Sequence, residues 1–430
     1  MRLFPFIFVL FLFVGLGVGG ASGSLTDISP TLTVGEADST DSPIDAETQL
    51  TTDTSVAQIE ENITQTRTLA NDPDSVVRVE LDREHADLGP AIIGQTDRTA
   101  AQITLGSIEK RLADAESDSE RQRRVLDELN TIEQQIITLE ENQQQAITQY
   151  NEEEIDSHQF VSEIVKITHE AEALEERMGV LVTTANEAGT SIDSNRRQGI
   201  ESSLGVFSGP VRTYGSAILT GAEQPDRIYV ETSDDGIVLS AIDGDTYTRE
   251  VLRSDRRDRG GGTIDLEDAE DVVQASYPEI WNESSTIRVD GSGSTVRVSI
   301  TTETGELIAF VDGGSEQVFK EHRQETVSEV VPTNETTRAQ SGLNVTVQQT
   351  YVGGPLLISV VDSNSGAPVE EATVTVGQGS EESDVVGKTD SDGELYALEP
   401  RGTYTVAVLS GTNTAFVELD SNEPRALGTR

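Results

Sequence analysis

The sequence predicts a multi-domain α+β protein, because the periodicity of its apolar residues changes twice along the chain. In residues 97–188, apolar side chains recur three and four positions apart, which indicates amphipathic helices. In residues 212–330 they alternate with polar ones on both sides of a single helical stretch, which indicates a central antiparallel sheet with one helix. Residues 344–425 contain only short strands and turn residues, the pattern of a C-terminal β-sandwich.

The first 56 residues predict an export segment followed by a spacer. Arg2 precedes an apolar run from Leu3 to Gly19 and small residues follow, so residues 1–23 have the layout of a secretory signal peptide. No pair of arginines precedes the run, which favours the Sec route. An uncleaved signal anchor is the alternative, because about seventeen apolar residues are nearly enough to cross a membrane. Residues 24–56 are rich in Ser, Thr and Asp, which predicts a disordered acidic spacer.

A short mixed segment, residues 57–96, leads to the helical region, residues 97–188. The residues expected to line three helix faces are Ile103, Ile108, Leu112 and Ala115; Val125, Leu129, Ile132, Ile136 and Leu139; and Phe160, Ile164, Ile167, Ala171, Leu174, Met178 and Leu181. Asp156 and Gln159 form a plausible capping box for the third helix. Because the connections are short, we expect a helical hairpin or a coiled-coil bundle, and the same faces could equally form the seam of a homo-oligomer.

Two predicted linkers separate the remaining modules. Residues 189–211 are rich in Gly, Ser and Asn, and residues 331–343 lie between the central module and the sandwich. Within the central module, the turn sequences Asp234-Asp235-Gly236 and Asp243-Gly244-Asp245 separate alternating segments, which indicates hairpins. The stretch from Asp265 to Tyr277 is expected to be the helix that packs on the sheet.

The net charge constrains the habitat more than the function. The chain has 77 acidic and 30 basic residues, a net charge of -47, and only four lysines. Such a surface repels itself in ordinary buffer, but is well screened and soluble in brine. We therefore expect a protein of a halophile, the alternative being an acidic, partly disordered protein of an ordinary habitat. Nucleic acid is not an expected partner, because no basic stripe is present; a protein or a cell-envelope component is.

Three segments resemble known families. The C-terminal segment, with Gly366-Ala367-Pro368-Val369 and the run Thr389 to Leu395, resembles the carboxypeptidase regulatory-like domain, a transthyretin-type sandwich. Residues 268–320, with Tyr277-Pro278 and Gly305-Glu306-Leu307, are similar to the PepSY domain. The whole chain, with Tyr150 to Ile155 ahead of its strand-rich part, resembles uncharacterised secreted proteins of haloarchaea. These resemblances imply a non-catalytic spacer or adhesive module and, through the PepSY-like module, modulation of a peptidase.

The sequence contains no recognisable catalytic constellation. There is no cysteine, and none of the four histidines lies in a nucleophile or metal-binding motif. We therefore predict that the protein is not an enzyme and carries no cofactor. A hydrolase that uses a pair of carboxylates stays open, since among 77 acidic residues such a pair would be invisible.

Calcium is the one metal that the sequence suggests. Asp362, Asn364, Asp390 and Asp392 place oxygen ligands at alternate positions in two turns, as a hard cation prefers. Ordinary turn chemistry is the competing explanation, because Asp and Asn side chains also cap local backbone amides. Asparagines followed two residues later by Ser or Thr are candidates for glycosylation, and they are Asn62, Asn282, Asn334 and Asn344.

The combined interpretation is a non-catalytic structural or interaction protein, secreted or at the cell surface of a halophilic archaeon. A regulator of an envelope peptidase is the runner-up, and a carboxylate-based hydrolase the third hypothesis. Contact with a membrane is expected only if the N-terminal segment is retained as an anchor. The sequence does not identify a specific partner, an oligomeric state or a substrate.

The first prediction concerns salt. Because the Debye length falls from about 10 Å at 0.1 M to about 3 Å at 1 M, screening should strengthen folding of so acidic a chain. Circular dichroism of the purified protein across a KCl or NaCl series should show stability rising toward molar salt. A protein equally stable at low salt would overturn the halophile hypothesis.

Overall fold

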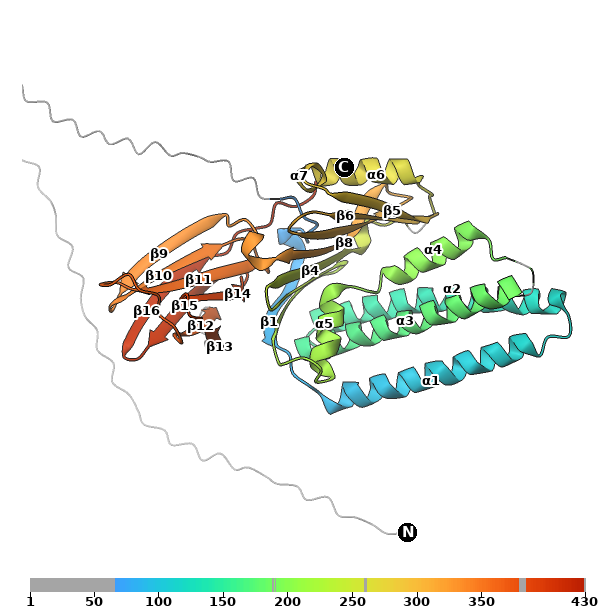
Figure 1. Ribbon diagram of the computed structural model, residues 1–430, viewed down its shortest axis with the longest axis horizontal. Helices are drawn as coiled ribbons and strands as arrows, with labels where there is room; N and C mark the ends of the chain where they lie inside the picture. Colours follow the sequence, from blue (N-terminus) through green and yellow to red (C-terminus); the bar gives the residue numbers. More distant parts are fainter. Residues whose placement is uncertain (1–65, 188, 190, 259–260, 379–383, 429–430) are drawn as a thin grey trace, which may run out of the picture. The chain divides into compact units, whose positions relative to one another are not determined.

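The computed structural model describes residues 66–428 except 188, 190, 259–260 and 379–383 (Figure 1). All these residues belong to one unit of the chain, residues 60–430. The predicted signal peptide, the predicted spacer and Asn62 lie outside the described residues. The described part is a multi-domain α+β protein, with a helical region, a central antiparallel sheet and a C-terminal sandwich, as the sequence predicts.

The helical region consists of three long helices joined by short turns. They are α1 (Leu88–Ala113), α2 (Asp118–Asn151) and α3 (Ser157–Glu187). The predicted capping box is confirmed: Gln159 N donates to Asp156 Oδ1 at 2.8 Å, and Asp156 N donates to Gln159 Oε1 at 3.1 Å. Leu129, Ile132 and Leu181 are fully buried in the core that α2 and α3 share, while Ile108 and Leu112 attach α1 to it.

The segment predicted as a linker, residues 189–211, instead contains helix α4 (Ser194–Gly205) and the start of α5 (Pro210–Leu219). The side chain of Asp193 accepts a hydrogen bond from Arg196 N and caps α4, and Pro210 begins α5. Ile200 and Leu204 are buried against the long helices. The Gly, Ser and Asn content of residues 189–211 suggested a linker. A few buried apolar residues and an N-terminal cap are nevertheless enough to form a helix where the long helices offer a surface to pack against.

The central sheet has eight antiparallel strands in the order β1-β2-β3-β4-β8-β7-β6-β5. They are β1 (Val76–Arg83), β2 (Arg227–Ser233), β3 (Gly236–Asp243), β4 (Thr246–Arg253), β5 (Thr286–Ser292), β6 (Thr295–Thr301), β7 (Gly305–Asp312) and β8 (Gln317–Thr326). Strand β1 comes from the mixed segment 57–96 and pairs with β2, so that Glu80 lies opposite Val230. The sheet therefore extends beyond the predicted central module.

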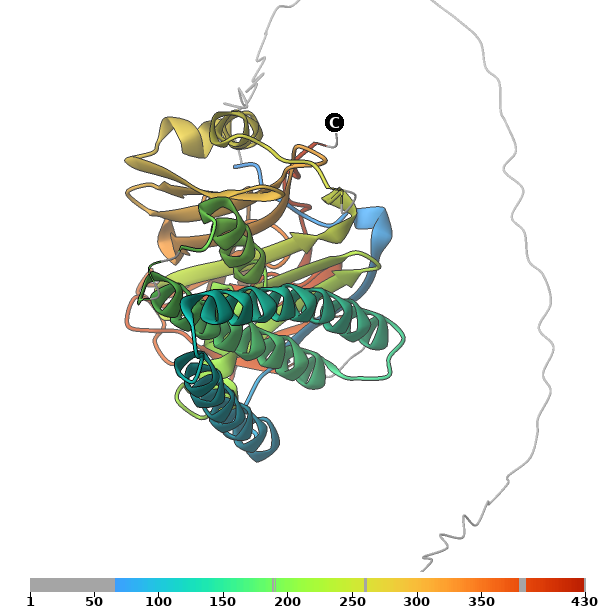
Figure 2. The ribbon, with the colours of Figure 1, turned by 90° about the vertical axis from the view of Figure 1, so that its right-hand side faces the viewer.

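Helices cover both faces of this sheet. On one face, α2, α3 and α5 pack on β2, β3 and β4 through a core that includes Tyr150, Phe160 and Ile218 (Figure 2). On the other face lie α6 (Leu266–Ser276) and α7 (Pro278–Asn282), with a core that includes Ala269, Val273 and Tyr277. The central strands are consequently enclosed on both sides.

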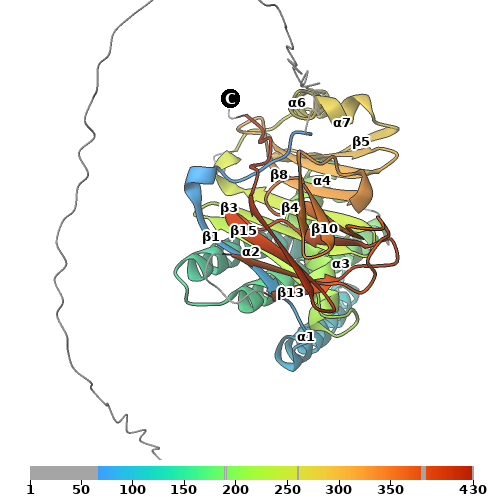
Figure 3. The ribbon, with the colours of Figure 1, turned by 90° about the vertical axis from the view of Figure 1, so that its left-hand side faces the viewer.

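The C-terminal region forms two four-stranded sheets, in the orders β14-β11-β10-β9 and β13-β12-β15-β16 (Figure 3). The strands are β9 (Asn334–Gln340), β10 (Leu343–Gln349), β11 (Pro355–Asp362), β12 (Thr373–Gln378), β13 (Asp384–Lys388), β14 (Glu394–Leu398), β15 (Thr403–Ser410) and β16 (Asn413–Asp420). Their inward residues form one apolar core. Strand β9 occupies the predicted linker 331–343. The sequence did not reveal this strand, because an exposed edge strand needs no alternation of apolar and polar residues.

The two ends of the described chain meet above the face that α6 covers. Thr68 N donates to Arg425 O at 3.0 Å, and Leu427 N donates to Thr68 O at 2.9 Å. Leu69 and Leu427 both belong to the core beneath them. The residues after the sandwich thus return to the sheet and close over the first described segment.

A loop of the sandwich region touches the central sheet at Gly353. Its carbonyl oxygen accepts hydrogen bonds from Ser240 Oγ at 2.6 Å and Tyr247 OH at 3.0 Å. Gly353 has a φ of +73°, and a Cβ at this position would lie 2.8 Å from the ring of Tyr229. Both the backbone conformation and the close approach therefore require glycine.

The second prediction compares two glycines with similar backbones. Gly366 has a φ of +68°, but a Cβ there would have no other atom within 4 Å, so Gly366→Ala should cost only the left-handed conformation, about 1–2 kcal/mol. Gly353→Ala should cost a further 1–3 kcal/mol, roughly, because it forces Tyr229 to move. Denaturant unfolding in molar salt measures both. Equal losses would show that the loop does not bear on the sheet.

Candidate functional site

The two central strands of the sheet carry a cluster of buried charges. On β4 these are Arg249 and Glu250, and on β8 they are Lys320, Glu321, His322 and Arg323. In the register of β4 and β8, Arg249 lies opposite Arg323 and Glu250 opposite His322. Because side chains alternate along a strand, the charges divide between the two faces. Since both faces are covered, each charge needs a partner within the protein.

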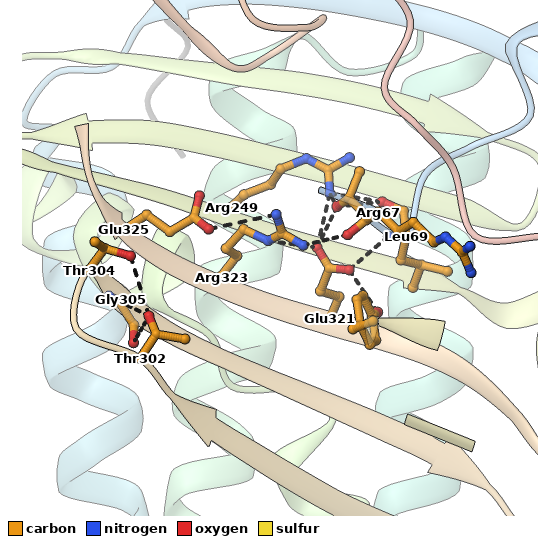
Figure 4. Close-up of polar contacts among 11 residues, drawn as sticks. Arg67, Leu69, Arg249, Thr302, Thr304, Gly305, Glu321, Arg323 and Glu325 are labelled. Carbon is orange, nitrogen blue, oxygen red and sulfur yellow. Dashed lines mark hydrogen bonds and ion pairs between the residues drawn. The ribbon is translucent and has the colours of Figure 1, made fainter. Parts of the chain in front are cut away.

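On the face covered by α6, Glu321 is the centre of the cluster (Figure 4). Its carboxylate is fully buried and accepts hydrogen bonds from Thr68 Oγ1 at 2.6 Å, Leu69 N at 2.7 Å and Tyr277 OH at 2.8 Å. Arg249 Nη1 lies 3.4 Å from its Oε1. Burial, and then the charge of Glu321, raises the pKa of Tyr277 well above its usual range, so this phenol stays protonated and donates.

Two arginines on this face hold the first described segment. Arg249 Nη1 donates to Leu69 O at 2.8 Å, and Arg323 Nη2 donates to Arg67 O at 2.7 Å. Although burial acts in the opposite direction, the carboxylates of Glu321 and Glu325 raise the pKa of Arg323. The charged groups therefore fasten a segment that lies 180 to 256 residues away in sequence.

On the opposite face, the charges fasten the start of α5. Glu250 accepts hydrogen bonds from Arg212 N at 2.9 Å and from Arg212 Nε at 3.0 Å, and so caps the helix N-terminus. Lys320 Nζ donates to the carbonyls of Val206 and of Ser208, the latter at 2.6 Å. Burial and the charge of Arg212 lower the pKa of Lys320 well below its usual range. Burial and the charge of Lys320 lower that of His322.

A cavity of about 130 Å³ adjoins the first of these faces, and Arg323, Glu325 and Tyr351 line it. Arg323 is already held by the Arg67 carbonyl and by Glu321 and Glu325. Burial raises the pKa of the Tyr351 hydroxyl and of the Glu325 carboxyl. Arg323 thus links the first described segment to the wall of this cavity.

Two of the histidines meet at the junction of β1, α1 and α3. His158 Nδ1 lies 2.6 Å from Glu84 Oε2 and its Nε2 lies 3.4 Å from Asp87 Oδ2, while His85 stacks on its ring at 4.5 Å. Although burial opposes it, Glu84 and Asp87 raise the pKa of His158. Within the ranges that the structure describes, no group of three or more His, Asp or Glu side chains could hold a metal ion.

The predicted calcium ligands lie in two turns whose carboxylates cap backbone amides. Asp362 Oδ1 accepts from Asn364 N at 3.0 Å and from Ser365 N at 2.8 Å, which lowers the pKa of Asp362. Asp390 Oδ1 accepts from Asp392 N at 2.9 Å and from Glu394 N at 2.9 Å. The side chains of Asn364 and Asp392 are exposed. These contacts account for the residue types, and calcium binding stays a prediction.

The predicted glycosylation sites differ in accessibility. Asn282 ends α7 and is exposed, and Asn334 is exposed at the start of β9, where its Nδ2 donates to Gln349 Oε1 at 3.2 Å. Asn344 is half-buried in β10. Asn282 and Asn334 are therefore the more accessible sites for a modification that stays a prediction.

Sequence reasoning missed the buried charge cluster. The strands predicted at Thr246–Leu252 and Gln317–Glu321 belong to an antiparallel sheet, in which one face can lie in water and Arg, Glu and Lys need no partner. The signal that could have revealed the cluster is the charged run from Lys320 to Arg323, which places charges on both faces of one strand. Only the position of β8 at the middle of the sheet shows that both faces are covered.

The third prediction tests the role of Glu321. Glu321→Gln leaves Arg249 and Arg323 buried without their shared counter-charge, so it should lower the free energy of unfolding by about 3–5 kcal/mol. The matched control is Glu423→Gln, which removes the half-exposed partner of Arg401 and should cost at most about 1 kcal/mol. Denaturant unfolding measures both variants. A loss no larger for Glu321→Gln than for the control would contradict the central role of this carboxylate.

Two findings bear on the sequence-based resemblances. Residues 228–331 match a family of unknown function (DUF7094), and residues 334–417 match the archaeal fibronectin-III type-like domain. The C-terminal β-sandwich is thus confirmed, whereas the resemblances to the carboxypeptidase regulatory-like domain and to PepSY are not. Both rested on short local motifs, such as the turn at Gly366 and the Tyr277-Pro278 pair between α6 and α7, and few residues define them.

No curated protein and no solved structure matches the chain. None of the described helices is long and apolar enough to cross a membrane. The remaining match is to a domain of unknown function (DUF7096) over residues 3–224, which include the whole helical region and strand β1. Because this match spans just over half of the 430 residues, the chain belongs to the DUF7096 family.

Proposed function

We propose that the protein is a non-catalytic structural or interaction protein of the cell surface of a halophilic archaeon, exported by the Sec route. The observation that carries the proposal is the archaeal fibronectin-III type-like sandwich, which is fastened to the sheet rather than joined to it by a free linker. Such a sandwich is consistent with a structural or binding role. The apolar N-terminal run and the net charge of -47 support export and a saline habitat.

Ion pairs and backbone hydrogen bonds fasten the sandwich. Arg401 Nη2 lies 2.9 Å from Glu231 Oε2 of strand β2, and Arg401 Nη1 lies 2.5 Å from Glu423 Oε1. Glu231 is buried and also accepts from Tyr229 OH at 2.6 Å. Together with the hydrogen bonds from Ser240 and Tyr247 to the Gly353 carbonyl, the Arg401–Glu231 pair fastens the sandwich to the central sheet.

The surface that we propose for partner binding is the outer face of the sheet β13-β12-β15-β16. In the strand register, Val385, Thr375, Ala407 and Phe416 form one row across the four strands. Val385 is 55% exposed and Phe416 is 48% exposed. In the next row Leu409, also 48% exposed, lies between Thr373 and Thr414. These two rows carry no carboxylate, in a chain where 77 of 430 residues are acidic; Lys388 ends the second row beside Thr373, and the exposed Glu418 follows Phe416 on the same face.

Exposed apolar rows on so acidic a chain favour a protein partner with an apolar surface of its own. Contact there buries Val385, Leu409 and Phe416, whose rows hold no carboxylate to desolvate. The partner we propose is therefore another cell-envelope protein. The runner-up hypothesis, a peptidase regulator, rests on a PepSY resemblance that is not confirmed, and no contact described above favours it.

The fourth prediction tests this surface. Phe416→Asp should abolish binding of the purified protein to haloarchaeal envelopes in molar salt, because it replaces an exposed aromatic ring of this row with a charge. Thr337→Asp adds the same charge to the exposed face of β9 in the other sheet, and should leave binding unchanged. Sedimentation of the protein with envelopes measures the bound fraction, and circular dichroism checks folding.

Two outcomes would contradict the proposal. Equal binding by both variants would show that this face does not dock. Turnover of a peptide or glycan by the purified protein, lost on substitution of a single carboxylate, would show that the protein is an enzyme.

A further inference from the structure

Among the described residues, one buried arginine has no carboxylate partner. Four arginines are buried, and three of them are paired: Arg212 with Glu250 at 3.0 Å, Arg249 with Glu321 at 3.4 Å, and Arg323 with Glu321 at 3.6 Å. The fourth, Arg256, has as its hydrogen bond only a contact from Nη2 to Gly428 O at 3.3 Å. Its Nε has no hydrogen-bond partner at all.

An uncompensated guanidinium in this position is costly. Arg256 is only 6% exposed, so most of its hydration is lost. The nearest acidic residue in sequence, Asp255, is already engaged by Arg253 at 2.7 Å. Burial and the charge of Arg253 lower the pKa of Arg256, which shows that its surroundings disfavour the positive charge. In a chain with 77 acidic residues, the missing counter-charge calls for an explanation.

The explanation that the structure offers is a cavity beside this side chain. The cavity has a volume of about 220 Å³ and is lined by Arg256 and, from the first described segment, Arg67. Arg67 Nη1 donates to Ala275 O at 3.3 Å, and its Nε lies 4.0 Å from Glu279, so it keeps further donor capacity. The apolar part of the lining consists of Val272, Ala275, Val318 and Leu427.

This lining defines the chemistry of an occupant. Two guanidinium groups match the planar oxygens of a carboxylate, and the apolar wall matches a short hydrocarbon body. Glu316 also lines the cavity, and its charge disfavours a polyvalent anion. A cavity of roughly 150 Å³ is enough for a benzene ring, so this one admits a small aromatic or aliphatic acid.

We propose that the cavity between Arg256 and Arg67 binds a small monocarboxylate with an apolar body, which supplies the counter-charge of Arg256. The site is independent of the sandwich face that we propose for docking, and it lies where the C-terminal residues Leu427 and Gly428 cover α6 and β8. Binding there would stabilise the closure of the two described ends.

Benzoate is the probe, and benzamide is its neutral isostere. Calorimetric titration of the full chain in molar NaCl should show binding of benzoate and no binding of benzamide. Arg256→Gln should weaken benzoate binding about tenfold or more, because a charge-assisted hydrogen bond is lost. The control is Arg338→Gln on the exposed strand β9, which should bind benzoate like the unchanged protein.

A second measurement keeps the test decisive. Without benzoate, Arg256→Gln should be at least as stable toward denaturant as the unchanged protein, because it removes an uncompensated buried charge. If that variant does not fold, Arg67→Gln takes its place and should also weaken benzoate binding. The proposal is overturned if benzoate does not bind, if benzamide binds equally well, or if the folded arginine variant binds benzoate as tightly as the control.

Discussion

The carboxylate of Glu321 is the interaction on which the rest of the architecture depends. It sits in the middle of an eight-stranded sheet and binds Thr68 and Leu69, Arg249 and Tyr277, which come from the first described segment, from β4 and from the end of α6. The first of these is 253 residues away in sequence. A buried ion pair adds little net stability, but a half-complete one is strongly unfavourable. The cluster therefore penalises any arrangement in which one of these segments is out of place.

Local structure followed from the sequence wherever the signal was local. The capping box of Asp156 and Gln159 and the long amphipathic faces of α2 and α3 were predictable from spacing alone, as were the hairpins that join β2, β3 and β4. Strand β1 was not, because its partner β2 lies about 150 residues away. Helix α4 and strand β9 were missed because their composition is that of a linker. The charge cluster and Arg256 were missed since burial on both faces is a tertiary property.

The three sequence families do not correspond to three folding units. Strand β1 belongs to the DUF7096 segment but pairs with β2 of the DUF7094 segment. The residues after the fibronectin-like match, around Arg425 and Leu427, bond to Thr68 of the DUF7096 segment. Family boundaries at residues 224–228 and 331–334 thus cut through shared sheets and cores. The helices, the sheet and the sandwich are better regarded as interdependent layers, each of which completes the burial of another.

The meeting of Thr68 with Arg425 and Leu427 has a mechanical consequence. Tension applied between the two described ends would act first on this short parallel pairing, whose two backbone hydrogen bonds measure 3.0 and 2.9 Å. The force would not pass through the sheet and the helices until these two hydrogen bonds had broken. The pairing in turn depends on the residues of the first described segment that Arg249, Glu321 and Arg323 bind. The buried charged residues would thus help to set the force at which the two described ends separate.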